Sequence, residues 1–126
     1  MAKRKSNKNK IQIKTPQDIA EMRIACETAS DILQNVAKFI TAGKTTKEVD
    51  LYAAELMKER DCVSAFLGYR GFPAYTCISM NEEVVHGIGC DRVIQDGDIV
   101  SVDVGITKGG WIGDNATTVS REFTAE

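Results

Sequence analysis

Apolar residues recur at helical spacing in the first third of the chain. They step by three and four positions along one face: Ile19, Met22, Cys26, Ala29, Leu33, Val36 and Ile40. Thr15, Pro16 and Asp18 stand at the start of this stripe and supply an N-cap, a proline suited to the first helical turn and an early acid. The pattern predicts an amphipathic helix that begins at Pro16 and stops near Gly43.

A second helix is predicted to begin at Thr46 and to end near Arg60. Thr45 and Glu48 have the spacing of a capping box, in which the hydroxyl and the carboxylate bond the free backbone groups of the first turn. The predicted buried face consists of Val49, Tyr52, Ala53, Leu56 and Met57.

The rest of the pattern is typical of short strands separated by loops that contain glycine and proline. Strand-like runs occupy residues 11–13, 64–67 and 76–80, and a strand is expected to give way to a loop within residues 84–87. Loops or turns are expected at residues 68–73, 81–83 and 95–98. Helices followed by antiparallel strands predict an α+β fold, with two helices packed on an antiparallel sheet.

The clearest strand lies at residues 99–106, where apolar and polar residues alternate. One face carries Val100, Val102, Val104 and Ile106, and the other carries Ser101, Asp103 and Gly105. This alternation predicts a strand that is buried on one face only. A turn signal follows at residues 108–110, so residues 111–119 are expected to return as the partner strand of a hairpin.

The length of the hairpin loop decides how Asp103 and Asp114 lie relative to each other. A loop of Lys108 and Gly109 places the two carboxylates directly opposite. A loop of Gly109 and Gly110 instead moves Asp114 to a diagonal position on the same face. Only a loop with an odd number of residues would separate them.

Two negative charges side by side on one sheet face destabilise each other unless a cation lies between them or one is protonated. Oxygen ligands of this kind favour a hard or borderline divalent metal ion. The competing interpretation is that Asp114 caps a turn with Asn115 while Asp103 is solvated. The apolar strand around Asp103 argues against it.

His86 is the only histidine, so any imidazole chemistry of this chain depends on it. It is expected where a strand gives way to a loop, a place where side chains often face a cleft. A single histidine can equally have a structural role. A ring that titrates near neutral pH would also suit hydrogen bonding to a polar substrate group.

Composition narrows the class of protein. The 126 residues are 43% hydrophobic and 27% charged, as in an ordinary globular domain. No apolar run is long enough to cross a bilayer, and no signal-peptide pattern follows Met1. The four cysteines form no C-x-x-C pair, so we expect reduced thiols, with Cys62 and Cys90 exposed, in a cytoplasmic protein.

The charge is concentrated at the start of the chain. Five of the 16 basic residues lie within residues 1–10, and none of the 18 acidic residues does. This pattern predicts a flexible basic arm, which either serves as a solvated tail or contacts the ribosome or other RNA through phosphates.

Three motifs together resemble the type I methionine aminopeptidases of the peptidase M24 family. They are N-E-x-V-x-H-G at residues 81–87, D-G-D-I-V at residues 96–100, and two aspartates separated by ten residues, Asp103 and Asp114. The resemblance extends over residues 11–119. It implies the first half of a pita-bread fold, whose complete form surrounds two divalent metal ions, with Co, Mn, Fe, Zn and Ni all compatible.

The resemblance also implies roles for individual residues. Asp103 and Asp114 match two aspartate ligands of the metal centre, and His86 matches a catalytic histidine that contacts the substrate near the scissile amide. The positions that match the pocket for the methionine side chain are Phe66, Tyr69, Phe72 and Cys77. Some family members have a cysteine at the position of Phe66 and a tyrosine at that of Phe72.

The family's remaining ligands, one histidine and two glutamates, belong to the second half of its fold. Residues 11–126 are therefore expected to form an incomplete, inactive N-terminal half of the catalytic domain. The complete protein is expected to be a monomer that removes the N-terminal methionine from peptides and nascent chains, with neither membrane nor DNA as a partner.

Two other functions compete with this expectation. One is a non-catalytic pita-bread module that binds peptide, RNA or the ribosome, and the other is a proline-directed peptidase. The presence of both Asp103 and Asp114 favours the enzyme over the binding module. The motif around His86 and the short segment before the helices argue against the proline-directed peptidase.

Overall fold

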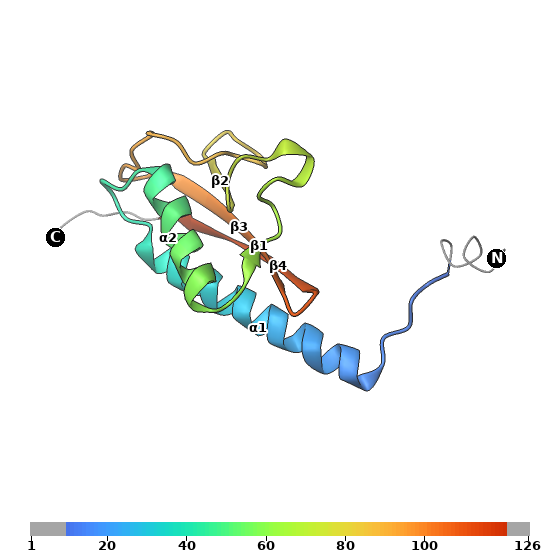
Figure 1. The fold of residues 1–126 in the computed structure, drawn as a ribbon. Helices are drawn as coiled ribbons and strands as arrows, with labels where there is room; N and C mark the ends of the chain where they lie inside the picture. Colours follow the sequence, from blue (N-terminus) through green and yellow to red (C-terminus); the bar gives the residue numbers. More distant parts are fainter. Residues whose placement is uncertain (1–9, 121–126) are drawn as a thin grey trace.

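The computed structural model describes residues 10–120. Its elements, in chain order, are α1 (Pro16–Phe39), α2 (Thr46–Glu59), β1 (Val63–Ser64), the 3-10 turn η3 (Tyr69–Gly71), β2 (Cys77–Met80), β3 (Ile99–Lys108) and β4 (Trp111–Ser120). The two helices pack on one face of a four-stranded antiparallel sheet (Figure 1). The predicted α+β class is confirmed. The predicted basic arm falls, apart from Lys10, outside the described residues.

All the other strands are arranged around β3. One edge of β3 pairs with β2 along its first half, from Val100 opposite Met80 to Asp103 opposite Cys77, and with β1 near its end. The other edge pairs with β4 along its whole length. β3 is therefore the central strand, held on both sides.

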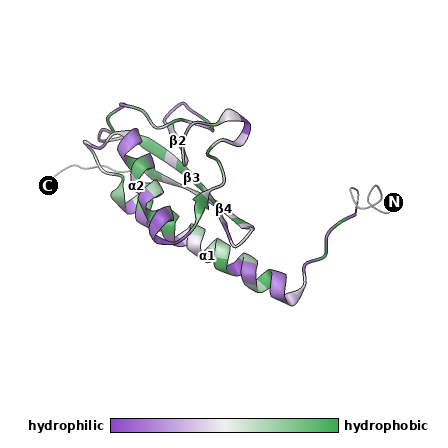
Figure 2. Cartoon of the chain, in the orientation of Figure 1, coloured by the Kyte–Doolittle hydropathy of each residue, from purple (hydrophilic) through white to green (hydrophobic). Residues whose placement is uncertain are grey.

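The aliphatic face of β3 forms the middle of the core. Its four aliphatic side chains are at most 1% exposed: Val100, Val102, Val104 and Ile106. Figure 2 shows much of β3 in the green of hydrophobic residues. The four aliphatic side chains of β3 pack against buried residues of both helices, among them Ala29, Ile32, Val36, Val49 and Ala53. Burying each such aliphatic side chain contributes about 1.5–3 kcal/mol, so this face strongly favours the observed strand orientation.

Both helix starts are fixed by capping boxes. The Thr15 hydroxyl accepts a hydrogen bond from the Asp18 backbone N–H (3.1 Å), and the Thr15 N–H donates to the Asp18 carboxylate (2.9 Å). Thr45 and Glu48 form the same reciprocal pair at the start of α2. The predicted starts of both helices are confirmed.

The predicted apolar stripe of α1 is buried only in part. Its second half, from Ala29 to Ile40, lies in the core, but Ile19 is 46% exposed and Cys26 is also exposed. For Ile19 the physical reason is visible in Figure 1, where the first turns of α1 extend past the β3–β4 hairpin and have no sheet to cover them. Cys26 instead lies beside the buried face of α1, which runs through Ala25 and Ala29. The helical spacing was therefore a correct guide to the helix but not to its buried length.

Several short predicted strands are wrong. Residues 11–13 form no strand, and Ile11 and Ile13 are at least 90% exposed. The run at residues 64–67 pairs only through Val63–Ser64, because the chain then leaves the sheet, and residues 84–87 form a loop. Cys62, expected to be exposed, is 8% exposed because the chain folds back at the end of α2, where its Sγ contacts the Met57 carbonyl.

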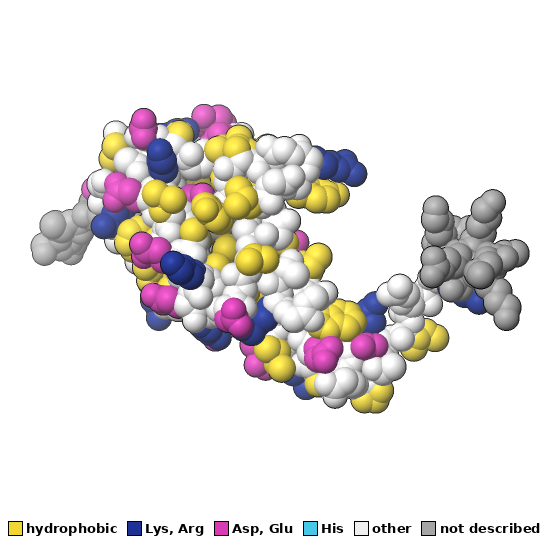
Figure 3. All heavy atoms as spheres, in the orientation of Figure 1, with side chains coloured by type: hydrophobic (Ala, Val, Ile, Leu, Met, Phe, Trp, Pro, Cys, Tyr) yellow, Lys and Arg dark blue, Asp and Glu magenta, His cyan; other side chains and the backbone are white. Residues whose placement is uncertain are grey.

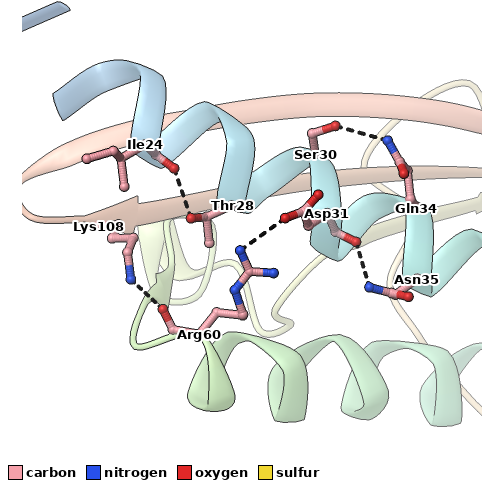
Figure 4. Close-up of polar contacts among 8 residues, drawn as sticks. All are labelled: Ile24, Thr28, Ser30, Asp31, Gln34, Asn35, Arg60 and Lys108. Carbon is pink, nitrogen blue, oxygen red and sulfur yellow. Dashed lines mark hydrogen bonds and ion pairs between the residues drawn. The ribbon is translucent and has the colours of Figure 1, made fainter. Parts of the chain in front are cut away.

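Polar contacts at the surface connect α1, α2 and the end of β3 (Figure 4). Arg60, directly after α2, forms an ion pair with Asp31 of α1 at 3.1 Å, and Lys108 Nζ donates to the Arg60 carbonyl. Because both side chains of the ion pair are about half exposed, this pair contributes at most about 1 kcal/mol. These contacts fix where the end of α2 lies relative to its neighbours.

An apolar groove runs beside α2. Its volume is about 740 Å³, and its walls include Leu51, Met57, Val63, Leu67 and Tyr75. Figure 3 shows hydrophobic side chains gathered on this face of the molecule. Neither Asp103 nor Asp114 lines this groove. Within residues 10–120, no helix combines the length and apolar character that a bilayer crossing requires.

Gly113 allows β4 to lie directly against α1. A Cβ atom at this position would be 2.5 Å from the Ala25 carbonyl oxygen and 3.1 Å from the Ala29 Cβ. Such contacts would force the strand and the helix apart.

We therefore predict that Gly113→Ala lowers the free energy of unfolding by about 1–3 kcal/mol, the usual cost of overpacking a core. Urea denaturation measures this value. The matched control is Ala116→Val, which adds carbon atoms to the opposite, exposed face of the same strand and should change stability by less than about 0.5 kcal/mol. Equal losses in the two variants would contradict the tight approach of β4 to α1.

Candidate metal and substrate site

The β3–β4 hairpin closes with a two-residue loop. Lys108 pairs with Trp111, so Gly109 and Gly110 form the loop. Both have positive φ angles, 58° and 82°, as the two central residues of a type I′ turn require. The second of the two predicted registers is the correct one.

This register places the two aspartates diagonally on the same face of the sheet. Asp103 pairs with Ala116, and Asp114 pairs with Gly105 two positions further along β3. Because strand residues two apart share a face, both carboxylates project away from the helices. Asp114 lies within a continuous strand and caps no turn, so the competing interpretation of Asp114 is wrong.

The two carboxylates perturb each other. Burial, the hydrogen bond with Asp114 and the negative charge of Asp114 together raise the pKa of Asp103 to about 6, and burial has the largest effect. Asp103 Oδ1 is buried and has no hydrogen-bond partner among the described residues. The other buried side-chain oxygen of this kind is Asn115 Oδ1, which lies on the helix side of β4. The carboxylate pair therefore contains one buried oxygen that lacks a hydrogen-bond donor.

Cys77 adjoins the carboxylate pair on the same face. It pairs with Asp103 across β2 and β3 and is only 6% exposed. Burial, followed by the negative charges of Asp103 and Asp114, raises the pKa of its thiol to about 11. Cys77 is therefore a neutral thiol at physiological pH and forms an apolar, polarisable surface beside the carboxylates.

The ring of Phe66 covers the sheet next to Asp103. A Cβ atom at Gly105 would lie 2.5 Å from Phe66 Cε1, so the ring occupies the space that a side chain on β3 would fill. The backbone holds this arrangement, because the Ala65 N–H donates to the Gly105 carbonyl at 2.8 Å. Gly105 is therefore needed for the close approach of the aromatic ring.

Tyr69 and Phe72 come from a tight loop beyond Phe66. The Gly68 N–H donates to the Phe72 carbonyl at 2.8 Å, and the Phe72 N–H donates to the Tyr69 carbonyl at 2.9 Å. Gly68 and Arg70 both have positive φ angles, which turn the loop sharply. The guanidinium of Arg70 lies 5.3 Å from the centre of the Tyr69 ring.

His86 lies on the loop after β2, in a backbone conformation that is unusual for histidine. Its φ angle is 59°, in the left-handed region, and such conformations persist only where the surrounding structure enforces them. The neighbouring Gly87 provides this constraint. The Ile78 N–H donates to the Gly87 carbonyl and the Gly87 N–H donates to the Ser79 hydroxyl, both at 3.0 Å.

The structure brings every residue of the predicted site around one pocket of about 620 Å³. The residues of that prediction are Phe66, Tyr69, Phe72, Cys77, His86, Asp103 and Asp114. A smaller hollow of about 260 Å³ shares Cys77, His86 and Asp103 and continues along the same face of the sheet. The roles of these residues stay predictions.

Four other residues line the pocket and were not predicted from the sequence as site residues: Arg70, Gly71, Pro73 and Ile88. Arg70 stands between the glycines of a predicted loop, and Ile88 directly follows the His86 motif, so proximity to recognised residues was the available signal. Within residues 10–120, no group of three or more His, Cys, Asp or Glu side chains is arranged to hold a metal ion. The two aspartates are thus present as a pair.

Known proteins share this sequence and fold. The methionine aminopeptidase of Haemophilus influenzae is 45% identical over 108 residues, which are 84% of this chain and 40% of that protein. The methionine aminopeptidase of Bacillus subtilis is 41% identical over 105 residues, 83% of this chain and 42% of that protein. The solved structure of the Thermotoga maritima methionine aminopeptidase superposes with a TM-score of 0.85 at 42% identity and covers 93% of this chain and 47% of that one.

The chain spans about two fifths of the length of the curated relatives that it matches. The superposition confirms the predicted fold, two helices packed on the antiparallel sheet of one half of a pita-bread fold. The sequence model of the family described as "Metallopeptidase family M24" matches residues 20–126. The chain belongs to metallopeptidase family M24.

Proposed function

We propose that this chain provides the methionine pocket and two metal ligands of a methionine aminopeptidase, which hydrolyses the first peptide bond of peptides and nascent chains that begin with methionine. The observation that carries the proposal is the pair of neighbouring carboxylates, Asp103 with its unpartnered buried oxygen and Asp114, in one pocket with His86 and three aromatic side chains. The names of the relatives support the same reaction.

Asp103 and Asp114 would hold the metal. The pair fits a divalent cation because one buried oxygen lacks a partner and because a cation would remove the repulsion between the two charges. Two carboxylates alone do not distinguish Mn, Co, Fe, Zn and Ni, and we propose two such ions per active site. When bound, the metal supplies an activated water and polarises the scissile carbonyl.

The remaining residues would bind and orient the substrate. Phe66, Tyr69 and Phe72 offer aromatic surfaces, and the neutral thiol of Cys77 lies beside them, so the pocket suits an unbranched thioether side chain. His86 faces the same pocket and would hydrogen-bond the amide at the scissile bond.

A cytoplasmic location follows as a proposal from the thiol chemistry. All four cysteines lie within the described residues and are free. Free thiols persist in a reducing compartment. A non-catalytic binding module needs no pair of neighbouring carboxylates in its pocket. This pocket contains such a pair, which favours the enzyme over the binding module.

Asp103→Asn tests the metal assignment through two effects of opposite sign. Without metal, the variant should be more stable at neutral pH by up to about 1 kcal/mol, because the repulsion from Asp114 is gone. With excess Mn²⁺, the wild type should gain thermal stability and the variant should not. Thermal denaturation with and without Mn²⁺ measures both effects.

The pH dependence gives the same test a further signature. The pKa of Asp103 is raised from 3.8 to about 6 in the folded state, so the metal-free wild type should lose stability as the pH rises through this window. Asp103→Asn should lack this loss. Asp91→Asn is the control, because Asp91 is exposed and lies outside the pocket. If Mn²⁺ stabilises Asp103→Asn as much as the wild type, Asp103 is not a metal ligand.

His86→Asn tests the substrate assignment in the protein expressed from the natural gene. Asparagine tolerates the left-handed backbone at this position, so the loop should keep its shape while the imidazole is lost. We expect kcat/KM for release of methionine from a Met-Gly peptide to fall by about 10²-fold. Glu82→Gln in the same loop is the control, and an unchanged rate in His86→Asn would remove His86 from the mechanism.

A further inference from the structure

Two buried polar residues of α2, Thr46 and Asp50, contact the segments that carry Cys77 and His86. Neither residue lines the pocket. They are four positions apart and therefore lie on one face of the helix. Thr46 is 2% exposed and Asp50 is 6% exposed.

Asp50 holds the residues that lead into β2. Its carboxylate accepts hydrogen bonds from the Thr76 N–H (2.8 Å), the Thr76 hydroxyl (2.5 Å) and the Tyr75 N–H (3.2 Å). Thr76 is fully buried and immediately precedes Cys77. The ion pairs found within residues 10–120 do not include Asp50, so its charge is stabilised by these donors. A buried carboxylate without them would be strongly destabilising.

Thr46 holds the loop that follows His86. Its hydroxyl accepts from the Cys90 N–H at 2.8 Å and donates to the Cys90 carbonyl at 3.2 Å. The Lys47 N–H donates to the same carbonyl at 2.9 Å, and the Thr46 N–H donates to the Arg92 carbonyl at 3.1 Å. The loop thus satisfies the Thr46 and Lys47 N–H groups, two of the free groups in the first turn of α2.

Gly89 brings the loop onto this face of α2. A Cβ atom at Gly89 would be 3.0 Å from the Thr46 carbonyl oxygen and 3.1 Å from the Asp50 Cβ. The loop is also fixed at its other end, because Gly87 is hydrogen-bonded to β2. His86 therefore lies just before a segment that is held between β2 and α2.

We propose that Thr46 and Asp50 are positioning residues, which fix the Cys77 wall and the His86 loop of the pocket relative to each other through one face of α2. A helix that contacts neither substrate nor metal would thus determine the pocket's shape. The importance of this shape for catalysis rests on the proposed function. The positioning itself does not, and the experiment separates the two.

The first measurement is the rate at which iodoacetamide alkylates each cysteine, followed by mass spectrometry. Cys77 and Cys62 are both buried, and Cys62 lies at the far end of α2, so it reports on general unfolding. Asp50→Asn replaces an acceptor oxygen with a donor amide. It should raise the Cys77 rate by about tenfold or more and leave the Cys62 rate unchanged, since losing a hydrogen bond to a charged group favours local opening to that degree.

The second measurement follows the NMR signals of the His86 imidazole, which are unambiguous because the chain has one histidine. Thr46→Val removes the hydroxyl and should shift or broaden these signals, and Thr46→Ser should restore them. Glu55→Gln, an exposed carboxylate variant of the same helix, should change neither measurement. If Asp50→Asn does not fold, Thr76→Val replaces it, because this variant removes only the hydroxyl donor to Asp50.

In folded variants, a parallel rise of the Cys62 and Cys77 rates, or unchanged His86 signals in Thr46→Val, would overturn the proposal. The third measurement is the affinity for a Met-Gly peptide in the presence of Mn²⁺. We expect it to fall about tenfold in Asp50→Asn and Thr46→Val, and to be kept in Glu55→Gln. Failure of the wild type to bind this peptide would count against the proposed function and leave the thiol and NMR results to judge the positioning.

Discussion

The register between β3 and β4 is the constraint on which the site depends. The two-glycine loop sets Gly105 opposite Asp114 and thereby puts Asp103 and Asp114 on one face. A shift by one residue would turn the acidic face of β4 towards the helices and bury charge in the core. Two like charges side by side on a sheet cost about 1 kcal/mol, less than the burial of the four aliphatic side chains of β3 contributes. The hydrophobic face therefore holds the carboxylates together against their repulsion.

The two faces of the sheet consequently have different roles. The helix face contains well-packed aliphatic side chains and contributes stability. The opposite face contains three features that cost stability, namely neighbouring carboxylates, the unpartnered Asp103 Oδ1 and a histidine in a left-handed conformation. Such features accumulate at functional sites and persist because the rest of the molecule offsets them.

Sequence alone predicted the parts of this protein that depend on local chemistry. Capping residues such as Thr15 and Thr45 act within four residues, and the alternation in β3 reports directly on its two faces, so the helix starts and the hairpin were predictable. The resemblance then supplied all seven site residues, which no single spacing would have brought together. The choice between the two registers needed the structure, because both loops obey the same pairing rules.

What sequence could not predict depends on contacts between distant segments. The exposure of Ile19 follows from where the sheet ends, and the burial of Cys62 follows from the turn after α2. Asp50 looks like an ordinary polar residue of an amphipathic helix, yet it is buried because Thr76, far along the chain, provides its donors. The strand predicted at residues 64–67 was too long, because the chain leaves β3 after the hydrogen bond from Ala65 to Gly105.

The path of the chain between β1 and β2 has a consequence for how such pockets can diversify. Ala65 bonds to Gly105 of β3, and Cys77 rejoins the same edge opposite Asp103, so the intervening segment departs and returns at neighbouring points of one strand. This excursion carries Phe66, Tyr69 and Phe72. The length and composition of this segment can therefore vary without moving the two carboxylates. Such variation would change the size and lining of the pocket.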